Sequence, residues 1–324
     1  MLRISEFQFQ DKVTTTLAIR SKQTRKTQAG NPYLHLDLSD RTGQITAKVW
    51  DASKSSIAWE SIETGGVYLF TGIVEEYQGQ QQFIVQDIDT VDSFDISDFI
   101  ASIEEDPKEL WKELNIYLSD MTNPFLITLA KRYLENEPLM ARFRQAPAAK
   151  SVHDDKLGGL LRHTTRLVRL SREIIELYPE MHADKDLITL ALLLHDFEKI
   201  TEFSWDKATI QYTDTGHFIG HAGLSMIKVY HEIQAIEGFP DLLRDHLIHI
   251  IASHAAEFDP IRLPGTPEAM IVHYCDLVDS QLVHFKQEWD KNAGQGWKKD
   301  GLVDRYCYYP EKIEEPKKDP ETLF

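Results

Sequence analysis

The sequence predicts a multidomain α+β protein in which a small β-barrel of five strands precedes an all-α domain. Its 324 residues are enough for about two domains of ordinary size. Up to about residue 92, apolar and polar residues alternate with the period of a β-strand. From about Ser97 to about Lys291, apolar residues recur at helical spacing instead. This change of period divides the chain into a β part and a helical part.

Five short alternating runs follow one another in the β part, separated by turn signals such as Asp40-Arg41-Thr42-Gly43. The runs cover residues 13–19, 33–38, 44–50, 67–74 and 82–88. Five strands joined by tight turns that contain glycine are typical of a small closed barrel. We therefore assign residues 1–92 to a barrel domain.

The helical part divides into a connector and a larger domain. Residues 93–150 contain two helix start signals, Asp106-Pro107 and Asn123-Pro124, but no cluster of chemically reactive residues, so we assign them to a helical connector. Residues 151–291 form the larger helical domain, and an apolar stripe runs along residues 158–178 near its start. Residues 292–324 form a C-terminal segment that ends in a stretch rich in Pro, Lys and Glu, and we expect it to be partly disordered.

Charge and composition exclude several classes of protein. The chain has 35 basic and 52 acidic residues, a net charge of −17, so it does not coat duplex DNA or an anionic membrane by bulk charge. No apolar run approaches the roughly 20 residues that span a bilayer, and the first residues lack the apolar stretch of a signal peptide. Two cysteines, Cys275 and Cys307, are too few for a disulfide framework or a four-cysteine zinc site. We expect a cytoplasmic protein.

Histidines concentrate in the helical domain, where all but one of the 13 lie between His153 and His284. His163 falls on an apolar helix stripe, where a polar side chain is costly unless something satisfies it. His195 and Asp196 directly follow an apolar run that must be buried. An imidazole nitrogen beside a carboxylate suits a divalent metal, and the carboxylate is able to bridge two ions.

Further polar residues face inward on other helices of this domain. Asp276 lies on an apolar stripe of a helix that Thr266-Pro267 opens, His254 is in register with Leu247, and His221 completes the set. A single inward histidine is more often a hydrogen-bonded core residue than a ligand. Several such positions on separate helices indicate a shared metal site instead. The mixture of histidine and carboxylate favours Mn²⁺, with Fe²⁺ or Co²⁺ as alternatives, over Mg²⁺.

The order His163, His195-Asp196, Asp276 resembles the metal-binding pattern of the HD-domain phosphohydrolases. The wider motifs are similar to the YhaM-type 3′-to-5′ exoribonucleases, which also carry an N-terminal OB-fold. These motifs are Leu157-Gly158-Gly159-Leu160-Leu161-Arg162-His163-Thr164, Leu194-His195-Asp196-Phe197-Glu198-Lys199-Ile200, Gly220-His221, Ser253-His254 and Thr266-Pro267-Glu268-Ala269. Residues 30–34 and 40–51 resemble strands of the OB-fold. The likeness covers nearly the whole chain.

This resemblance implies an activity and a set of site residues. The metal ligands would be His163, His195, Asp196, His221, His254 and Asp276, with Asp196 and Lys199 as the catalytic residues and Lys199 close to the scissile phosphate. The enzyme would be a metal-dependent exonuclease that trims single-stranded RNA, and also single-stranded DNA, from the 3′ end to 5′-mononucleotides. The resemblance also implies a homo-oligomer.

The chain departs from the family pattern at four positions. Glu198 replaces a glycine, Ala255 and Asp154 replace histidines, and Lys156 replaces an aromatic residue. The changes at Asp154, Glu198 and Ala255 and the net charge of −17 keep open a catalytically weak protein that binds single strands. A second alternative is a phosphohydrolase that keeps the metal site but acts on small nucleotides, and the OB-fold argues against it.

The barrel offers a nucleic-acid platform, because OB barrels combine a basic groove with aromatic faces on which bases stack. Five basic residues and no acidic one lie between Lys12 and Leu36. We expect Lys22, Arg25 and Lys26 to point outward from a loop and contact the strand, together with Tyr33. Trp50, Tyr77 and Phe83 are further aromatic candidates, some of which must belong to the core.

Overall fold

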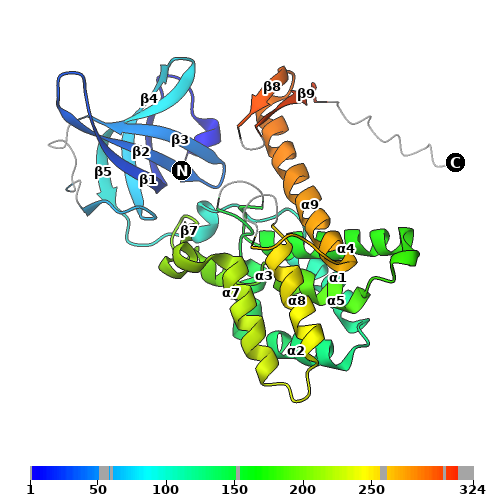
Figure 1. Cartoon of the computed structure of the whole chain (residues 1–324). Helices are drawn as coiled ribbons and strands as arrows, with labels where there is room; N and C mark the ends of the chain where they lie inside the picture. The colour runs from blue at the N-terminus through cyan, green and yellow to red at the C-terminus, as the bar shows by residue number, and fades with distance from the viewer. Residues whose placement is uncertain are drawn as a thin grey trace, which may run out of the picture.

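The computed structural model describes residues 2–50, 58, 61–150, 154–255, 261–301 and 304–312. Figure 1 shows a β-barrel beside a helical body, with the long helix α9 leading to a small hairpin at its C-terminal end. The predicted architecture, a barrel followed by a helical domain, is confirmed.

The barrel closes in the order β1-β2-β3-β5-β4. Its strands are β1 (Lys12–Lys26), β2 (Pro32–Asp40), β3 (Gly43–Val49), β4 (Val67–Tyr77) and β5 (Gln80–Thr90). β3 and β5 pair in parallel and the other neighbours are antiparallel. Alternate residues fill the interior, among them Leu17, Leu36 and Phe70, which are fully buried. All five predicted strands are present, although β3 ends at Val49, one residue before the predicted end at Trp50.

One local expectation about the barrel is wrong. Residues 20–26 were expected in a loop, but they form the second half of β1 and pair with β2 as far as Lys26 opposite Pro32. A register shift between Ile19 and Ser21 lets β1 bend and continue along β2. Side chains in this segment therefore alternate between two faces, and they do not all point outward.

The helices begin where the capping residues predict. The side chains of Asp106, Asn123 and Thr266 accept backbone N–H bonds at the starts of α1, α2 and α9, each followed by proline. The helical elements are η1 (Ile4–Glu6), η4 (Ile96–Asp98), α1 (Pro107–Ser119), α2 (Pro124–Leu134), α3 (Glu137–Gln145), α4 (Gly159–Leu177), η5 (Pro179–Met181), α5 (Lys185–Leu194), α6 (Lys199–Glu202), α7 (Asp214–Gln234), α8 (Asp241–Ser253) and α9 (Pro267–Asn292). The strands β6 (Phe203–Ser204) and β7 (Gln211–Tyr212) form a small sheet between α6 and α7.

Helix α5 is the centre of the helical body. Every residue from Leu187 to Leu194 is at most 1% exposed. The helix packs against α1, α2, α4, α8 and α9. Its apolar surface on all sides fixes its position and thereby the position of His195 and Asp196, which follow its last turn. No helix among the described residues is long and apolar enough to cross a membrane.

The predicted C-terminal segment contains a hairpin that the sequence did not indicate. Strands β8 (Gly296–Asp300) and β9 (Arg305–Tyr309) pair in antiparallel fashion after α9. Residues 313–324, where we expected disorder, lie outside the described residues.

Candidate metal centre

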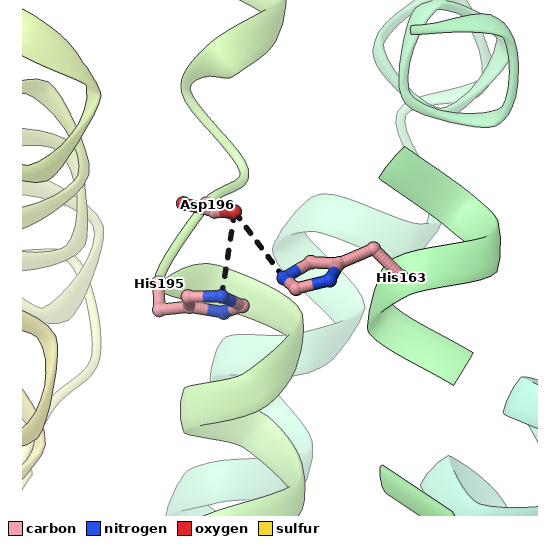
Figure 2. A group of neighbouring side chains, drawn as sticks. All are labelled: His163, His195 and Asp196. Carbon is pink, nitrogen blue, oxygen red and sulfur yellow. Dashed lines mark ion pairs between the residues drawn. The ribbon is translucent and has the colours of Figure 1, made fainter. Parts of the chain in front are cut away.

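The predicted ligands lie on separate elements that converge within the helical body. They are His163 in α4, His195 at the C-terminal cap of α5, Asp196 just after it, His221 in α7, His254 at the C-terminal cap of α8 and Asp276 in α9. His163, His195, Asp196 and His254 are at most 2% exposed. Figure 2 shows the rings of His163 and His195 directed at the Asp196 carboxylate.

The Asp196 carboxylate stands between two pairs of histidines. Its Oδ2 lies 3.6 Å from His163 Nε2 and 3.5 Å from His195 Nε2. Its Oδ1 lies 3.3 Å from His221 Nε2 and 3.6 Å from His254 Nε2. Each oxygen with its two imidazoles forms a group of three ligand atoms within 4.8 Å of one another. The two groups share Asp196, so this carboxylate could offer one oxygen to a metal in each group.

Hydrogen bonds fix the orientation of two of these rings. The Nδ1 of His195 donates to the Leu192 carbonyl at 3.0 Å, and the Nδ1 of His254 donates to the Ile251 carbonyl at 2.7 Å. Burial lowers the pKa of His195 to about 3 and also lowers the pKa of His254, so both rings are neutral. The Nε2 of each ring therefore presents a lone pair to the carboxylate.

A lone pair that faces a carboxylate oxygen at this distance is unfavourable unless a cation lies between them. Among the described residues, His195 Nε2 and Asp196 Oδ1 are buried without a hydrogen-bond partner. Neutral imidazole nitrogens and a bridging carboxylate form a donor set that suits divalent transition metals. The residues present therefore fit a divalent metal.

Two further carboxylates orient the other histidines. The Nδ1 of His163 donates to Asp279 Oδ2 at 2.7 Å, and the Nδ1 of His221 lies 3.0 Å from Glu202 Oε2. Gly220, with φ 73° and ψ 157°, interrupts α7 just before His221 and lets the His221 backbone N–H donate to the same Glu202. Carboxylate partners of this kind fix ring orientation and raise ligand basicity. Sequence reasoning missed both, because nothing in their spacing links Glu202 or Asp279 to a particular histidine.

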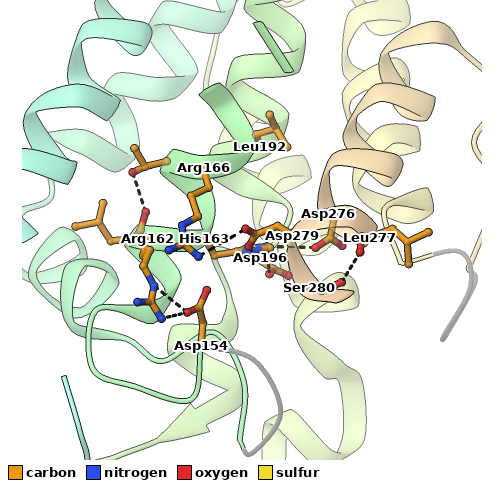
Figure 3. Close-up of polar contacts among 12 residues, drawn as sticks. Asp154, Arg162, His163, Arg166, Leu192, Asp196, Asp276, Leu277, Asp279 and Ser280 are labelled. Atoms are coloured by element: carbon orange, nitrogen blue, oxygen red, sulfur yellow. Dashed lines mark hydrogen bonds and ion pairs between the residues drawn. The ribbon is translucent and has the colours of Figure 1, made fainter. Parts of the chain in front are cut away.

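His163 also contacts Asp276, the predicted ligand from α9. Their Nε2 and Oδ1 atoms are 3.2 Å apart, and Figure 3 shows Asp276, Asp279 and Asp196 around the same ring. Burial opposes charging of His163, but Asp276 and Asp279 outweigh it and raise the pKa of this histidine to about 10. Asp276 and Asp279 thus attract positive charge to the point where the candidate ligand atoms meet.

Lys199 lies at the edge of this group, at the start of α6. Its Nζ is 2.7 Å from Asp196 Oδ2, and the residue is 8% exposed. Burial opposes the charged form, but Asp196 outweighs it and the pKa of Lys199 is raised. Lys199 is therefore a positively charged side chain that pairs with Asp196 beside the candidate ligands.

The departures from the family pattern have structural explanations at two positions. Glu198 has φ −77°, which requires no glycine, and its Oε1 lies 3.0 Å from Lys228 Nζ on α7. Asp154 is fully buried and accepts a bond from Arg162 Nε at 2.9 Å. It also belongs to a third group of potential ligand atoms, with His163 and Asp279. Ala255 offers no ligand atom, and His153 lies outside the described residues.

The Glu198–Lys228 pair makes a prediction about stability. Lys228→Met leaves a carboxylate that is 5% exposed without its cation, so we expect a loss of about 2 kcal/mol in the free energy of unfolding. Adding Glu198→Gly to this variant should recover most of the loss. Lys185→Met, which breaks an exposed pair with Asp120, is the control and should cost less than about 1 kcal/mol. Urea unfolding measures all four proteins, and equal losses for the two lysine variants would contradict the prediction.

The barrel brings several predicted nucleic-acid contacts together on one face. The rings of Tyr33 and Trp50 are 4.7 Å apart, and Lys48 Nζ lies 5.4 Å from the Trp50 ring and 4.9 Å from the Tyr77 ring. Arg25 pairs with Tyr33 across β1 and β2 and so shares its face. Trp50 and Tyr77 are 45% and 57% exposed. Sequence reasoning missed Lys48, although its spacing of two residues from Trp50 along a strand was a usable signal.

The other expected contacts are distributed differently. Lys26 is exposed, but Lys22 is half-buried and its Nζ donates to the Ile62 carbonyl at 2.8 Å. Phe83 is fully buried in the barrel core, so it is not a stacking platform. The face available to a ligand is therefore built from β2, β3 and the end of β4 more than from the basic stretch of β1.

Comparison with known proteins agrees with both domains. The OB-fold nucleic acid binding domain matches residues 16–91, and the HD domain matches residues 160–281. The chain is 26% identical over 320 residues to the 3′-5′ exoribonuclease YhaM of Halalkalibacterium halodurans, covering 97% of each chain. It is 29% identical over 279 residues to the 3′-5′ exoribonuclease YhaM of Bacillus subtilis, covering 84% of this chain and 86% of the relative. The resemblance that the motifs indicate is confirmed over nearly the whole length.

Proposed function

We propose that this chain, which shares the OB-fold and HD-domain order of the YhaM-type 3′-5′ exoribonucleases, is a metal-dependent 3′-to-5′ exoribonuclease that hydrolyses single-stranded RNA to 5′-mononucleotides. Single-stranded DNA is a second substrate of the same chemistry. One observation carries the proposal: the Asp196 carboxylate lies between two pairs of imidazole nitrogens. Each carboxylate oxygen is at most 3.6 Å from both nitrogens of the pair that it faces.

The site residues have distinct roles in this proposal. His163, His195, Asp196, His221, His254 and Asp276 would hold divalent metal, with Mn²⁺ preferred for a mixture of imidazole and carboxylate. A bound metal supplies an activated water and polarises the phosphoryl oxygens. Lys199 holds a positive charge at the edge of the site and would stabilise the negative charge that develops on the phosphate. Glu202 and Asp279 orient His221 and His163.

The barrel face would hold the single strand. Tyr33, Trp50 and Tyr77 provide rings for base stacking, while Lys48 and Arg25 provide charge for the phosphates. The exposed Lys26 extends this positive charge. Lys22 would contribute less, because its side chain is half-buried and its Nζ donates to the Ile62 carbonyl. Because the chain has a net charge of −17, such a local cationic and aromatic face is what attracts the strand. The direction of cleavage rests on the relatives.

Product analysis on 5′-labelled single-stranded RNA tests this function. With Mn²⁺ we expect a ladder of products that shorten from the 3′ end, and with a chelator we expect none. A circular RNA of the same sequence is the matched control and should resist cleavage, because an exonuclease requires an end. Faster hydrolysis of free nucleotides than of the oligonucleotide would favour a nucleotide phosphohydrolase. Binding of the strand without any cleavage would favour a catalytically weak binding protein.

A further inference from the structure

The β8–β9 hairpin follows the C-terminal end of α9 (Figure 1), and side-chain contacts anchor one of its faces. The Tyr309 ring stacks on Phe285 with centroids 5.4 Å apart. Asp300 lies 2.9 Å from His284 Nε2 and accepts a bond from the Tyr309 hydroxyl at 3.2 Å. Trp289 Nε1 donates to the Pro310 carbonyl at 2.7 Å. These contacts hold the hairpin in a defined position relative to α9.

The opposite face of the hairpin is aromatic and exposed. Trp297 pairs with Tyr308 across the strands, and Lys299 pairs with Tyr306, so all four side chains share one face. Trp297, Tyr306 and Tyr308 are 70%, 68% and 51% exposed, and the rings of Trp297 and Tyr308 are 5.4 Å apart. Large rings gathered on one exposed face mark an interaction surface.

The charges around this aromatic face point to a polyanion. The described part of the hairpin contains three exposed cations, in a chain with a net charge of −17. Lys299 lies on the aromatic face, whereas Lys298 and Arg305 lie on the other face and donate to Asn292 and Gln281. Of the nearby acids, Asp300 is buried on the anchored face, and Asp304 forms only an exposed pair with Lys299. Three exposed rings beside Lys299, with two more exposed cations on the same hairpin, combine stacking faces with positive charge, which is how proteins bind single-stranded nucleic acid.

A basic pocket joins the hairpin end of α9 to the barrel. The pocket has a volume of about 470 Å³, and its lining includes Gly43 and Gln44 from the barrel and Gln287 and Lys291 from the last turns of α9. Its lining has five cations, Arg20, Arg41, Lys150, Lys156 and Lys291, and three acids, Asp40, Asp155 and Asp290. This excess of cations lies between the barrel and the hairpin end of α9, where it would attract a polyanion.

We propose that the outer face of the β8–β9 hairpin, formed by Trp297, Lys299, Tyr306 and Tyr308, is a second binding surface for single-stranded nucleic acid, on which bases stack. This inference rests on the proposed function, because it assigns the hairpin to the same substrate. It adds a contact outside both the barrel and the metal centre. A longer strand would reach both surfaces, whereas a short one would occupy the barrel alone.

The test measures binding of the full-length protein to fluorescent single-stranded RNA by anisotropy, in chelator so that no cleavage occurs. We expect Trp297→Ala to weaken binding of a strand of about 20 nucleotides by about tenfold, since each base stack contributes that order of affinity. Trp297→Phe keeps a ring and should retain most of the affinity. Tyr230→Ala is the control, because Tyr230 is also exposed, at 48%, but lies on α7. A strand of about six nucleotides should bind the wild type and Trp297→Ala equally.

Three results would overturn the inference. If Trp297→Ala and the double variant Tyr306→Ala/Tyr308→Ala both bind RNA with wild-type affinity, the hairpin does not contact the substrate. The proposed function would still stand in that case, provided that the wild-type protein cleaves RNA. A change in molar mass by light scattering, with unchanged RNA affinity, would make the face a protein interface. Failure of the wild type to bind or cleave any single strand would overturn the proposed function as well.

Discussion

Replacing Asp196 with asparagine is expected to lower exoribonuclease turnover by about 10³-fold or more. Asp196 is the residue common to both histidine pairs, and its two oxygens face different pairs. An amide has one oxygen and no charge, so it cannot bridge two cations. Loss of several kcal/mol of metal-dependent stabilisation corresponds to a rate loss of this size. The measurement is kcat on labelled single-stranded RNA at saturating Mn²⁺.

A matched control separates this effect from damage to the fold. Asp186 is another buried aspartate, 4% exposed, at the start of α5, where it accepts bonds from Thr122 and Asn123. Asp186→Asn should reduce stability but leave turnover within a few-fold of wild type. Affinity for the RNA in chelator should be the same in Asp196→Asn and wild type, because the barrel face is untouched. Equal turnover of Asp196→Asn and wild type would show the metal assignment to be wrong.

Much of the fold could be predicted from the sequence, because the period of the apolar pattern reports directly on secondary structure. The barrel strands and the proline-marked helix starts followed from this pattern. The inward position of His163 followed as well, since a polar residue on an apolar stripe must be buried. Inward polar positions on separate helices also predicted a shared metal site. The full set of six residues came from the family resemblance, because tertiary packing decides which helix ends meet.

Features that depend on pairing across elements could not be predicted. The extension of β1 through Lys22 depends on a register shift opposite β2. The partners Asp279 and Glu202 depend on how α9 and α6 lie against the histidine rings. The hairpin after α9 was hidden because its strands are short, at five residues each, and rich in lysine and tyrosine, so they carry no apolar alternation. In each case the missing information was long-range contact.

Metal removal is expected to destabilise the helical domain, and this second large effect can be measured without any substrate. In the metal-free protein the Nε2 lone pairs of His195 and His254 face Asp196 at 3.5 and 3.6 Å. A cation that binds only the folded state stabilises it by about 2.7 kcal/mol at a concentration of 100 times its Kd. For a domain of this size, we expect Mn²⁺ to raise the Tm by several degrees above the value in chelator.

The same variants make this prediction specific. In Asp196→Asn the Mn²⁺-dependent rise in Tm should be largely lost, whereas Asp186→Asn should show the full rise from a lower starting value. His254→Gln, which removes one ligand from one pair, should retain part of the rise, because the pair of His163 and His195 remains. An equal rise in wild type and Asp196→Asn would mean that Mn²⁺ binds elsewhere, on the many exposed carboxylates of this acidic chain. If Mn²⁺ does not raise the Tm of the wild type, the protein tolerates the buried lone pairs without a metal. Protons alone would then have to balance the charge of Asp196 in this site.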